Sequence, residues 1–219
     1  MGLRELKKEQ TRQQIADTAW RLFADRGFDQ VTVAEVARES MVAPATVFNY
    51  FPTKEDLFFF RLEAFGSRLV EAIRARRQGE PALVAFRRFL LRPAGLLAQL
   101  EAGDRQALER LRTVHRMIAA SPALQAREQQ ALAGYADALA AELAAETGAA
   151  PDDVSARVAA TALMGVQRTL IDYVRKRVLA DDQPERLPAD VRRLGRRACA
   201  LLAEGLGNYA AKPAERSVR

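Results

Sequence analysis

Residues 11–57 read TRQQIADTAWRLFADRGFDQVTVAEVARESMVAPATVFNYFPTKEDL, and three short helical patterns follow one another within them. In the first pattern, apolar side chains recur at helical spacing: Ile15, Ala19, Leu22 and Phe23. Gly27 follows, and a glycine can adopt the left-handed conformation that ends many helices. The first helix is therefore expected to stop at Gly27, with Phe28 packing back against Phe23.

Capping signals mark the second helix. Thr32 and Glu35 have the spacing of a capping box, in which each side chain bonds the other residue's backbone N–H. This helix is expected to end near Ser40, and residues 41–43 then form a turn with Val42 as its buried anchor. Pro44 suits the first position of a third helix, where its missing N–H costs no hydrogen bond.

The third helix, residues 44–50, is too short to be stable alone, so packing must hold it. The i, i+4 spacing of Val47 and Phe51 directs both side chains inward. The residues expected to project outward carry small, hydroxyl, amide and phenol groups: Ala45, Thr46, Asn49 and Tyr50. Such groups suit base edges and phosphates, so the layout predicts a helix-turn-helix that binds DNA. The alternative is a solvated polar face.

A fourth helix is expected to begin after Thr53, a good N-cap residue. Lys54 would then lie at the positive end of the helix dipole, which is locally unfavourable. A DNA phosphate bound there would reverse this effect. The alternative is an exposed lysine with no partner.

This stretch resembles the DNA-binding domain of the tetracycline-repressor-like (TetR/AcrR) family of regulators. The matching residues are 15–19, 22–23, 27–28, 32–33, 36–37, 46–51 and 54–57. The resemblance implies an all-helical homodimer with two domains, and transcriptional repression that a small molecule relieves. The DNA contacts of the family, carried onto this chain, fall on Thr32, Thr46, Asn49, Tyr50 and Lys54, and we add Ala45 from the outward face.

Three residues depart from the family pattern. The family usually has Gly where Met41 stands, Ser or Thr near Ala43, and Tyr where Phe48 stands. Met41 must accept the backbone conformation that the turn imposes. Phe48 lacks the phenol that could bind a phosphate, so Tyr50 is expected to make that contact alone. These changes bear on the operator sequence more than on the fold.

Composition agrees with a cytoplasmic regulator. The 219 residues are 49% hydrophobic, which is ample for a core, and the net charge is +6. No apolar run approaches the ~18 residues of a membrane span, and the charged first ten residues do not resemble a signal peptide. The single Cys199 excludes an internal disulfide and a cysteine-based metal cluster, and no cofactor is expected.

The positive charge is unevenly distributed. Residues 1–54 contain eight Lys and Arg against seven Asp and Glu, so most of the net charge lies in the rest of the chain. Four basic residues near the N-terminus could form an arm along the DNA backbone or a solvated terminus: Arg4, Lys7, Lys8 and Arg12.

After residue 57 the pattern stays helical, without a strand signal. Expected helices end near Arg77, Glu101 (with a kink or break at Pro93), Ser121, Gly148, Leu179 and Leu206, and residues 181–188 form a loop. The chain is therefore expected to be all-α. We expect a helix-turn-helix DNA-binding domain at 1–53, a helical ligand-binding and dimerisation domain at 54–210, and a tail at 211–219.

The helix that opens at residues 151–153 is apolar almost all round in its middle, so it needs burial on several sides. Small residues at Ala162 and Gly165 would permit the close approach of another helix. The resemblance implies a homodimer formed through the last two long helices. The alternative is burial within a single chain.

Candidate effector-binding residues lie on apolar stripes of the middle helices, and each is a core residue by default. They are Phe86, Phe89, Leu111, His115, Met117, Tyr135, Met164 and Gln167. The only histidine, His115, shares its stripe with Leu111 and should face the interior.

The expected function is therefore a DNA-binding transcriptional regulator, a repressor released from its double-stranded operator by a small, largely apolar molecule. The alternative is a constitutive DNA-binding protein without an effector. An enzyme is not expected, because one His and one Cys that lie far apart in the sequence are thin material for catalysis, and no Gly-rich phosphate loop or HExxH-type pair occurs.

Overall fold

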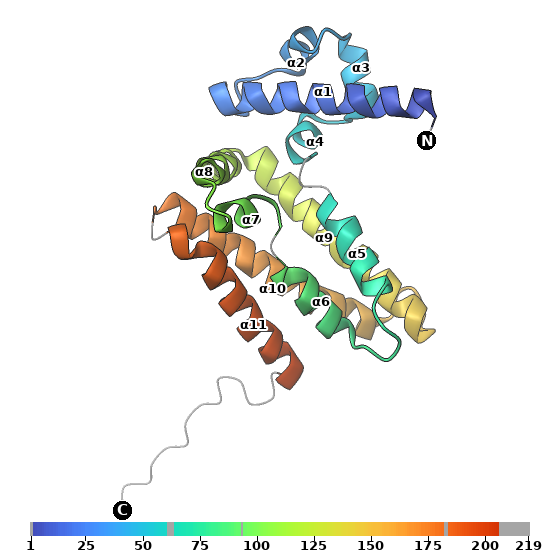
Figure 1. The fold of residues 1–219 in the computed structure, drawn as a ribbon. Helices are drawn as coiled ribbons and strands as arrows, with labels where there is room; N and C mark the ends of the chain where they lie inside the picture. Colours follow the sequence, from blue (N-terminus) through green and yellow to red (C-terminus); the bar gives the residue numbers. More distant parts are fainter. Residues whose placement is uncertain (1, 61–63, 93, 182–183, 206–219) are drawn as a thin grey trace, which may run out of the picture.

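The computed structural model describes residues 2–60, 64–92, 94–181 and 184–205, and the predicted tail at 211–219 lies outside these ranges. Secondary structure in the described residues is helical, which confirms the all-α fold (Figure 1). The helices are α1 (Leu3–Arg26), α2 (Val33–Glu39), α3 (Pro44–Tyr50), α4 (Lys54–Phe59), α5 (Ala64–Arg74), α6 (Ala82–Leu91), α7 (Gly95–Glu101), α8 (Arg105–Ala120), α9 (Pro122–Thr147), α10 (Val154–Leu179), the 3₁₀ turn η1 (Pro184–Arg186) and α11 (Leu187–Glu204).

Helices α1–α4 form a small unit, residues 2–60, which we call the head. Phe23, Phe28 and Phe58 meet inside it, with ring centroids 5.0 Å apart for Phe23–Phe28 and 5.9 Å for Phe28–Phe58. Gly27 permits this packing, because its φ of +87° and ψ of 152° form a combination that only glycine adopts readily. The contact of Phe28 with Phe23 is confirmed, but Gly27 does not have the left-handed helical conformation expected of it.

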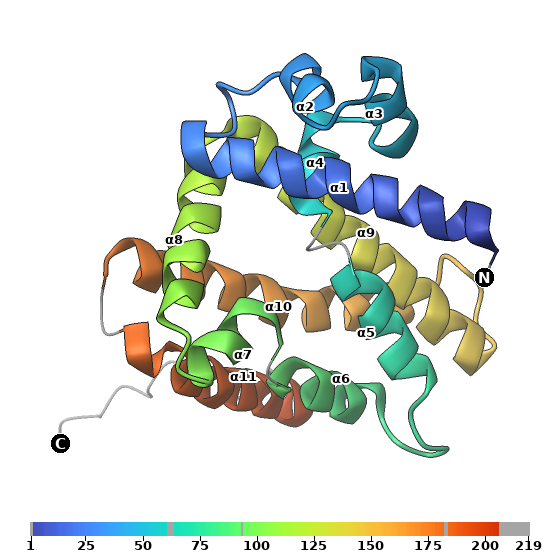
Figure 2. The same cartoon turned by 45° about the horizontal axis from the view of Figure 1, so that its top comes forward.

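Helices α5–α11, residues 64–204, form the body. Its core is an apolar cluster between α5, α6, α9, α10 and α11. Ion pairs reinforce the edge where α5 meets α9: Arg74 bonds Glu142 at 2.6 Å and Arg76 bonds Glu146 at 2.5 Å. In the ribbon, α9 and α10 run side by side through the middle, with α11 and α6 beside α10 (Figures 1 and 2).

Most expected helix ends agree with the structure, and two do not. A single helix from residue 54 to Arg77 was expected, but the structure has α4 ending at Phe59 and a separate α5 from Ala64 to Arg74. The expected loop at 181–188 contains η1 and the start of α11 at Leu187. The expected break near Pro93 separates α6 from α7, although Pro93 itself lies outside the described residues.

Helix α8 joins the head to the body. In Figure 2 it runs from the end of α1 down to α7 and α11. Its buried residues Val114, Met117 and Ile118 belong to the apolar cluster of the head. Two polar contacts lie at the same junction: Ser121 Oγ donates to Asp29 Oδ1 at 3.0 Å, and Arg127 Nε donates to Asp56 Oδ1 at 2.9 Å. The head is thus fixed to the body by apolar packing and by side-chain bonds.

Among the residues that the structure describes, no helix combines the length and the apolar character needed to cross a membrane.

Candidate DNA-binding surface and effector cavity

The turn between α2 and α3 has the geometry of a helix-turn-helix. Thr32 and Glu35 form the expected capping box, and Ser40 ends α2. Met41 then takes a φ of +56°, the left-handed region that favours glycine, and its side chain is 86% exposed. The half-buried Val42 donates its N–H to Ala37 O at 3.0 Å, and Pro44 begins α3 as expected. Met41 has therefore accepted the strained position that the family fills with Gly.

Packing fixes the orientation of α3. Val47 and Phe51 are buried in the head, as their spacing predicted. Ala45 and Asn49 are exposed, whereas Thr46 and Tyr50 are only half-exposed, and Tyr50 packs against the apolar cluster of the head. The expectation that Ala45, Thr46, Asn49 and Tyr50 all project outward is therefore only half correct, because Thr46 and Tyr50 lie partly against the head.

Phe48 is the residue that the polar-face expectation left out. It is 51% exposed, and the other nine phenylalanines of the chain are buried or half-buried. Together with Pro44, Ala45 and Asn49, it forms the outward surface of α3. The choice of outward residues by polarity missed it, and the helical period alone does not decide the position, because residue 48 lies about 100° from Val47, on the flank of the helix.

The other two expected DNA contacts are held by bonds within the head. The hydroxyl of Thr32 donates to Glu35 Oε2 at 2.9 Å and accepts from Glu35 N at 3.2 Å. Lys54 Nζ donates to Phe28 O at 3.1 Å and to Val31 O at 3.2 Å, and it lies 4.1 Å from the centroid of the Phe28 ring. An ammonium group has three N–H donors, so these two bonds leave one for a phosphate.

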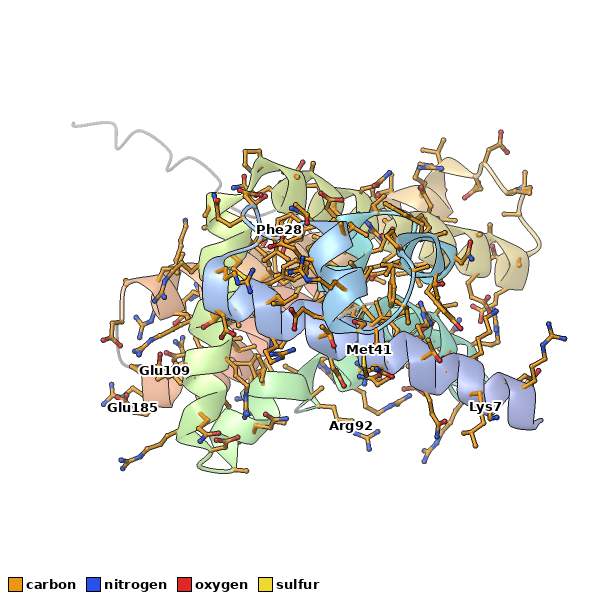
Figure 3. All side chains as sticks on the ribbon, turned by 90° about the horizontal axis from the view of Figure 1, so that it is seen from above. Lys7, Phe28, Met41, Arg92, Glu109 and Glu185 are labelled. Atoms are coloured by element: carbon orange, nitrogen blue, oxygen red, sulfur yellow. The ribbon has the colours of Figure 1, made fainter. Side chains whose placement is uncertain are left out.

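The expected N-terminal basic arm is helical from Leu3 onward. The side chain of Arg12 packs against two aromatic rings of the head, because its guanidinium lies 5.5 Å from the ring centroid of Phe51 and 4.5 Å from that of Phe60. Lys7 lies on the exposed end of α1, away from the rest of the head (Figure 3). Arg12 therefore stabilises the packing of α1 against Phe51, and the charges nearer the N-terminus remain on the surface.

The body contains a cavity of about 670 Å³ between α5, α6, α7, α8, α10 and α11. Four of the eight expected effector-binding residues line it: Phe89, Leu111, His115 and Gln167. Its remaining apolar wall comes mainly from leucines, isoleucine and valines of α6, α7, α10 and α11. The cavity therefore brings together half of the predicted residues, from three different helices.

The other four predicted residues do not line this cavity. Phe86 and Met164 are buried in the core of the body, and Met117 is buried in the cluster of the head. Tyr135 packs its ring beside Gly66, where an added Cβ would lie 2.1 Å from a Tyr135 ring carbon, and beside Phe65 at a centroid distance of 5.9 Å. The structure therefore places these four residues in the packing of the body and the head, and not in the cavity wall.

His115 is the polar group of α8 in the cavity wall. It is only 7% exposed, and its Nδ1 is buried with no hydrogen-bond partner among the described residues. Burial, and to a lesser extent the positive charge of Arg175, lower the pKa of His115 to about 4. The ring is therefore neutral near pH 7, which suits an apolar cavity.

Charged side chains also line the cavity, and none of them was predicted. They are Arg68, Arg92, Glu101 and Arg192. Glu101 accepts a bond from Arg192 Nη1 at 2.6 Å, so that pair is neutral overall. Arg92 extends outward beside the ribbon in Figure 3. Arg68 and Arg92 also line the wall, so arginines outnumber carboxylates among its lining residues. The four charged residues come from α5, the C-cap of α6, α7 and α11, so their meeting in one wall depends on how the helices pack, which no local pattern reveals.

Comparison with known proteins finds a family match in the head and another in the body. Residues 15–59 match the family model described as bacterial regulatory proteins of the tetR family, and residues 91–207 match the model described as the MftR C-terminal domain. The second match alone spans more than half of the chain.

Two relatives and one solved structure illustrate the likeness. The chain is 26% identical over 174 residues to MftR of Mycobacterium tuberculosis, a candidate mycofactocin biosynthesis transcriptional regulator, covering 76% of this chain and 81% of that protein. It is 33% identical over 85 residues to the HTH-type transcriptional regulator TcmR of Streptomyces glaucescens, a match that covers 39% of this chain and 38% of TcmR. The fold resembles that of the fatty acid degradation regulator FadR of Bacillus halodurans, with a TM-score of 0.52 and 22% identity over 92% of this chain and 97% of that one.

The helix-turn-helix geometry of the head and the family matches in both head and body lead to one conclusion. The chain belongs to the TetR family of bacterial regulatory proteins and is a DNA-binding transcriptional regulator.

Proposed function

We propose that the protein is a repressor that leaves its operator when a small, largely apolar molecule fills the cavity of the body. The observation that carries this proposal is the double use of α8. Leu111 and His115 of α8 line the cavity, while Val114, Met117 and Ile118 of the same helix belong to the cluster of the head. A ligand that moves α8 must therefore repack the head.

A polar contact supports the same coupling. Arg127 of α9 bonds Asp56, whose other oxygen accepts the N–H of Thr53 at 3.0 Å and so caps the start of α4. Burial raises the pKa of Asp56, but bonds from Thr53 and Arg127 outweigh it and lower this pKa overall. Asp56 is therefore charged at neutral pH, and it joins the body to the helix that follows α3.

The cavity also indicates the chemical class of the effector. A volume of about 670 Å³ suits a drug-sized molecule, and the wall is mostly apolar. Three arginines and one glutamate line the cavity, which disfavours a cation and favours a neutral or acidic lipophile. An acid group would pair with Arg92 while the apolar part contacts the leucines.

We propose that the functional unit is a homodimer formed through α10 and α11. Val154 and Val158 of α10 are 72% and 61% exposed. Gly165 follows two turns later on the same face and would permit close helix contact. A dimer would present two copies of α3, and their separation must match roughly 34–36 Å, one turn of DNA, or a multiple of it.

The dimer proposal is tested by light scattering after size exclusion, with and without DNA. We expect a dimer at micromolar concentration that binds one near-palindromic duplex. Val158→Glu places a charge in the proposed interface and should produce monomers, whereas Val84→Glu, a substitution of an exposed valine on α6, should not. A monomeric parent protein, or dimers in both variants, would refute this interface.

The effector proposal is tested with DNA that the purified protein selects from a randomised pool. Affinity for that duplex is measured with lipophilic acids, neutral lipophiles and cationic dyes. We expect an acid or a neutral compound to weaken binding about 5- to 150-fold, a coupling of about 1–3 kcal/mol. Release by cations alone would refute the ligand class. If no compound in any class releases the DNA, the constitutive alternative without an effector is favoured.

A further inference from the structure

The exposed surface of α3, the DNA-binding helix, is mostly apolar, although contacts with phosphates require hydrogen-bond donors. Pro44, Ala45, Phe48 and Asn49 are the exposed residues of α3, and Met41 lies exposed in the preceding turn. Three of the four exposed residues of α3 therefore have no side-chain hydrogen-bonding group. When such a helix enters the major groove, its apolar side chains either contact an apolar group of the DNA or cover the polar edges of the bases without bonding to them.

Phe48 is the largest of these apolar groups, and no contact among the described residues explains its exposure. Nine phenylalanines are packed at least half-buried, and Phe48 alone is exposed. Its ring stacks on no other ring of the described residues. An unsupported aromatic ring loses free energy in water, so contact with an apolar partner on DNA would recover it.

The major groove floor offers one apolar group, the 5-methyl group of thymine. Cytosine, guanine and adenine present polar donors and acceptors at their major-groove edges. Beside Phe48, the exposed Asn49 has the amide that pairs in bidentate fashion with N6 and N7 of adenine. The two neighbouring side chains thus match the two bases of A·T pairs.

We propose that Phe48 covers the 5-methyl group of a thymine in the major groove and makes the protein select an A·T pair at that position. Phe48 is then a specificity-determining residue in place of a phosphate contact. The proposal rests on α3 being the helix that enters the groove, which the family assignment supports.

The test replaces thymine by deoxyuridine, which differs only by the missing methyl group. DNA selected from a randomised pool by the full chain is resynthesised with each thymine changed in turn to deoxyuridine. Burial of one methyl group contributes roughly 0.8 kcal/mol, so one substitution per half-site should weaken binding about fourfold. The symmetric pair of substitutions should weaken it roughly fifteenfold, because distant sites add.

Variants assign the effect to the side chain. Phe48→Ala should bind the thymine and deoxyuridine duplexes equally, and Phe48→Leu should retain part of the difference. Asn49→Ala is the matched control, since it removes a neighbouring exposed side chain and should keep the fourfold difference. Because Phe48 and Asn49 are both exposed and the Phe48 ring is unstacked, all three variants should melt within a few degrees of the parent, which calorimetry checks.

Each outcome decides a different claim. Deoxyuridine that costs less than about 1.5-fold at every thymine overturns the proposal, as does a penalty that persists in Phe48→Ala. A selected sequence without an A·T pair in each half-site also overturns it. If the pool yields no preferred sequence, specific operator binding fails together with this proposal, whereas insensitivity to deoxyuridine in a well-defined operator refutes the thymine contact alone.

Discussion

Lowering the pH from 7.5 to 5 should destabilise the fold through His115, the only histidine of the chain. In the folded protein its pKa is lowered to about 4 from an ordinary 6.5, chiefly by burial and then by the charge of Arg175. Between pH 6.5 and 4 the unfolded chain binds a proton at this residue and the folded chain does not. Stability is therefore fully present above pH 6.5, falls as the pH approaches 4, and does not change further through this group below that.

The size of the effect follows from the two pKa values. The full difference of about 2.5 units corresponds to roughly 3 kcal/mol, and about 2 kcal/mol of it should be lost by pH 5. A small domain has only about 5–15 kcal/mol of stability in total, so this loss is easily measured. Carboxylates with lowered pKa values, such as Asp56, stay charged between pH 7.5 and 5 in the folded protein.

Urea unfolding at pH 7.5, 6 and 5, at one protein concentration, measures the loss. His115→Gln is the control, because glutamine stays neutral and keeps a polar group in the cavity wall. The parent should lose about 2 kcal/mol more than the variant between pH 7.5 and 5. If both lose the same free energy within about 0.5 kcal/mol, His115 is solvated or hydrogen-bonded in solution, and the argument from its burial is wrong.

Three further predictions concern packing, DNA and coupling. Gly66→Ala should cost about 1–3 kcal/mol of stability, because its Cβ would lie 2.1 Å from a ring carbon of Tyr135, and an unchanged melting temperature would contradict that packing. Lys54→Ala should reduce the slope of log affinity against log salt by about one without changing which DNA sequence is preferred; a changed preference would exclude a phosphate role. Arg127→Ala should weaken the effector's influence on operator affinity by about 0.5–2 kcal/mol. Arg157→Ala removes only an exposed ion pair and should not, so equal behaviour of these two variants would refute coupling through Arg127.

The helix-turn-helix was predictable because its signals are local. A capping box needs only two residues at fixed spacing, and Thr32 with Glu35 forms one as expected. Pro44 begins α3 as expected, and this signal is also local, because it depends only on the missing N–H of one residue. The break between α4 and α5 was not predictable in this way, since neither Gly nor Pro occurs between Phe59 and Ala64 and the apolar pattern continues through it.

The cavity was only partly predictable because its walls depend on the meeting of several helices. His115 follows Leu111 by four residues, so both lie on the same stripe and both line the cavity. Met117 is six residues from Leu111, about 240° around the helix, and it faces the head instead. On α3, the outward residues were chosen because they are small or polar, and this choice left out Phe48, which is 51% exposed.

The double use of α8 has a consequence for how such a regulator can diverge. A substitution on α8 that suits a new effector also changes a helix that packs in the apolar cluster of the head through Val114, Met117 and Ile118, so it is tested by selection for DNA binding at the same time. Gln167 and Ile171 of α10, and Leu90 of α6, line the same cavity without belonging to the cluster of the head. We expect related proteins with different effectors to vary first at such positions, and to keep the residues of α8 longest.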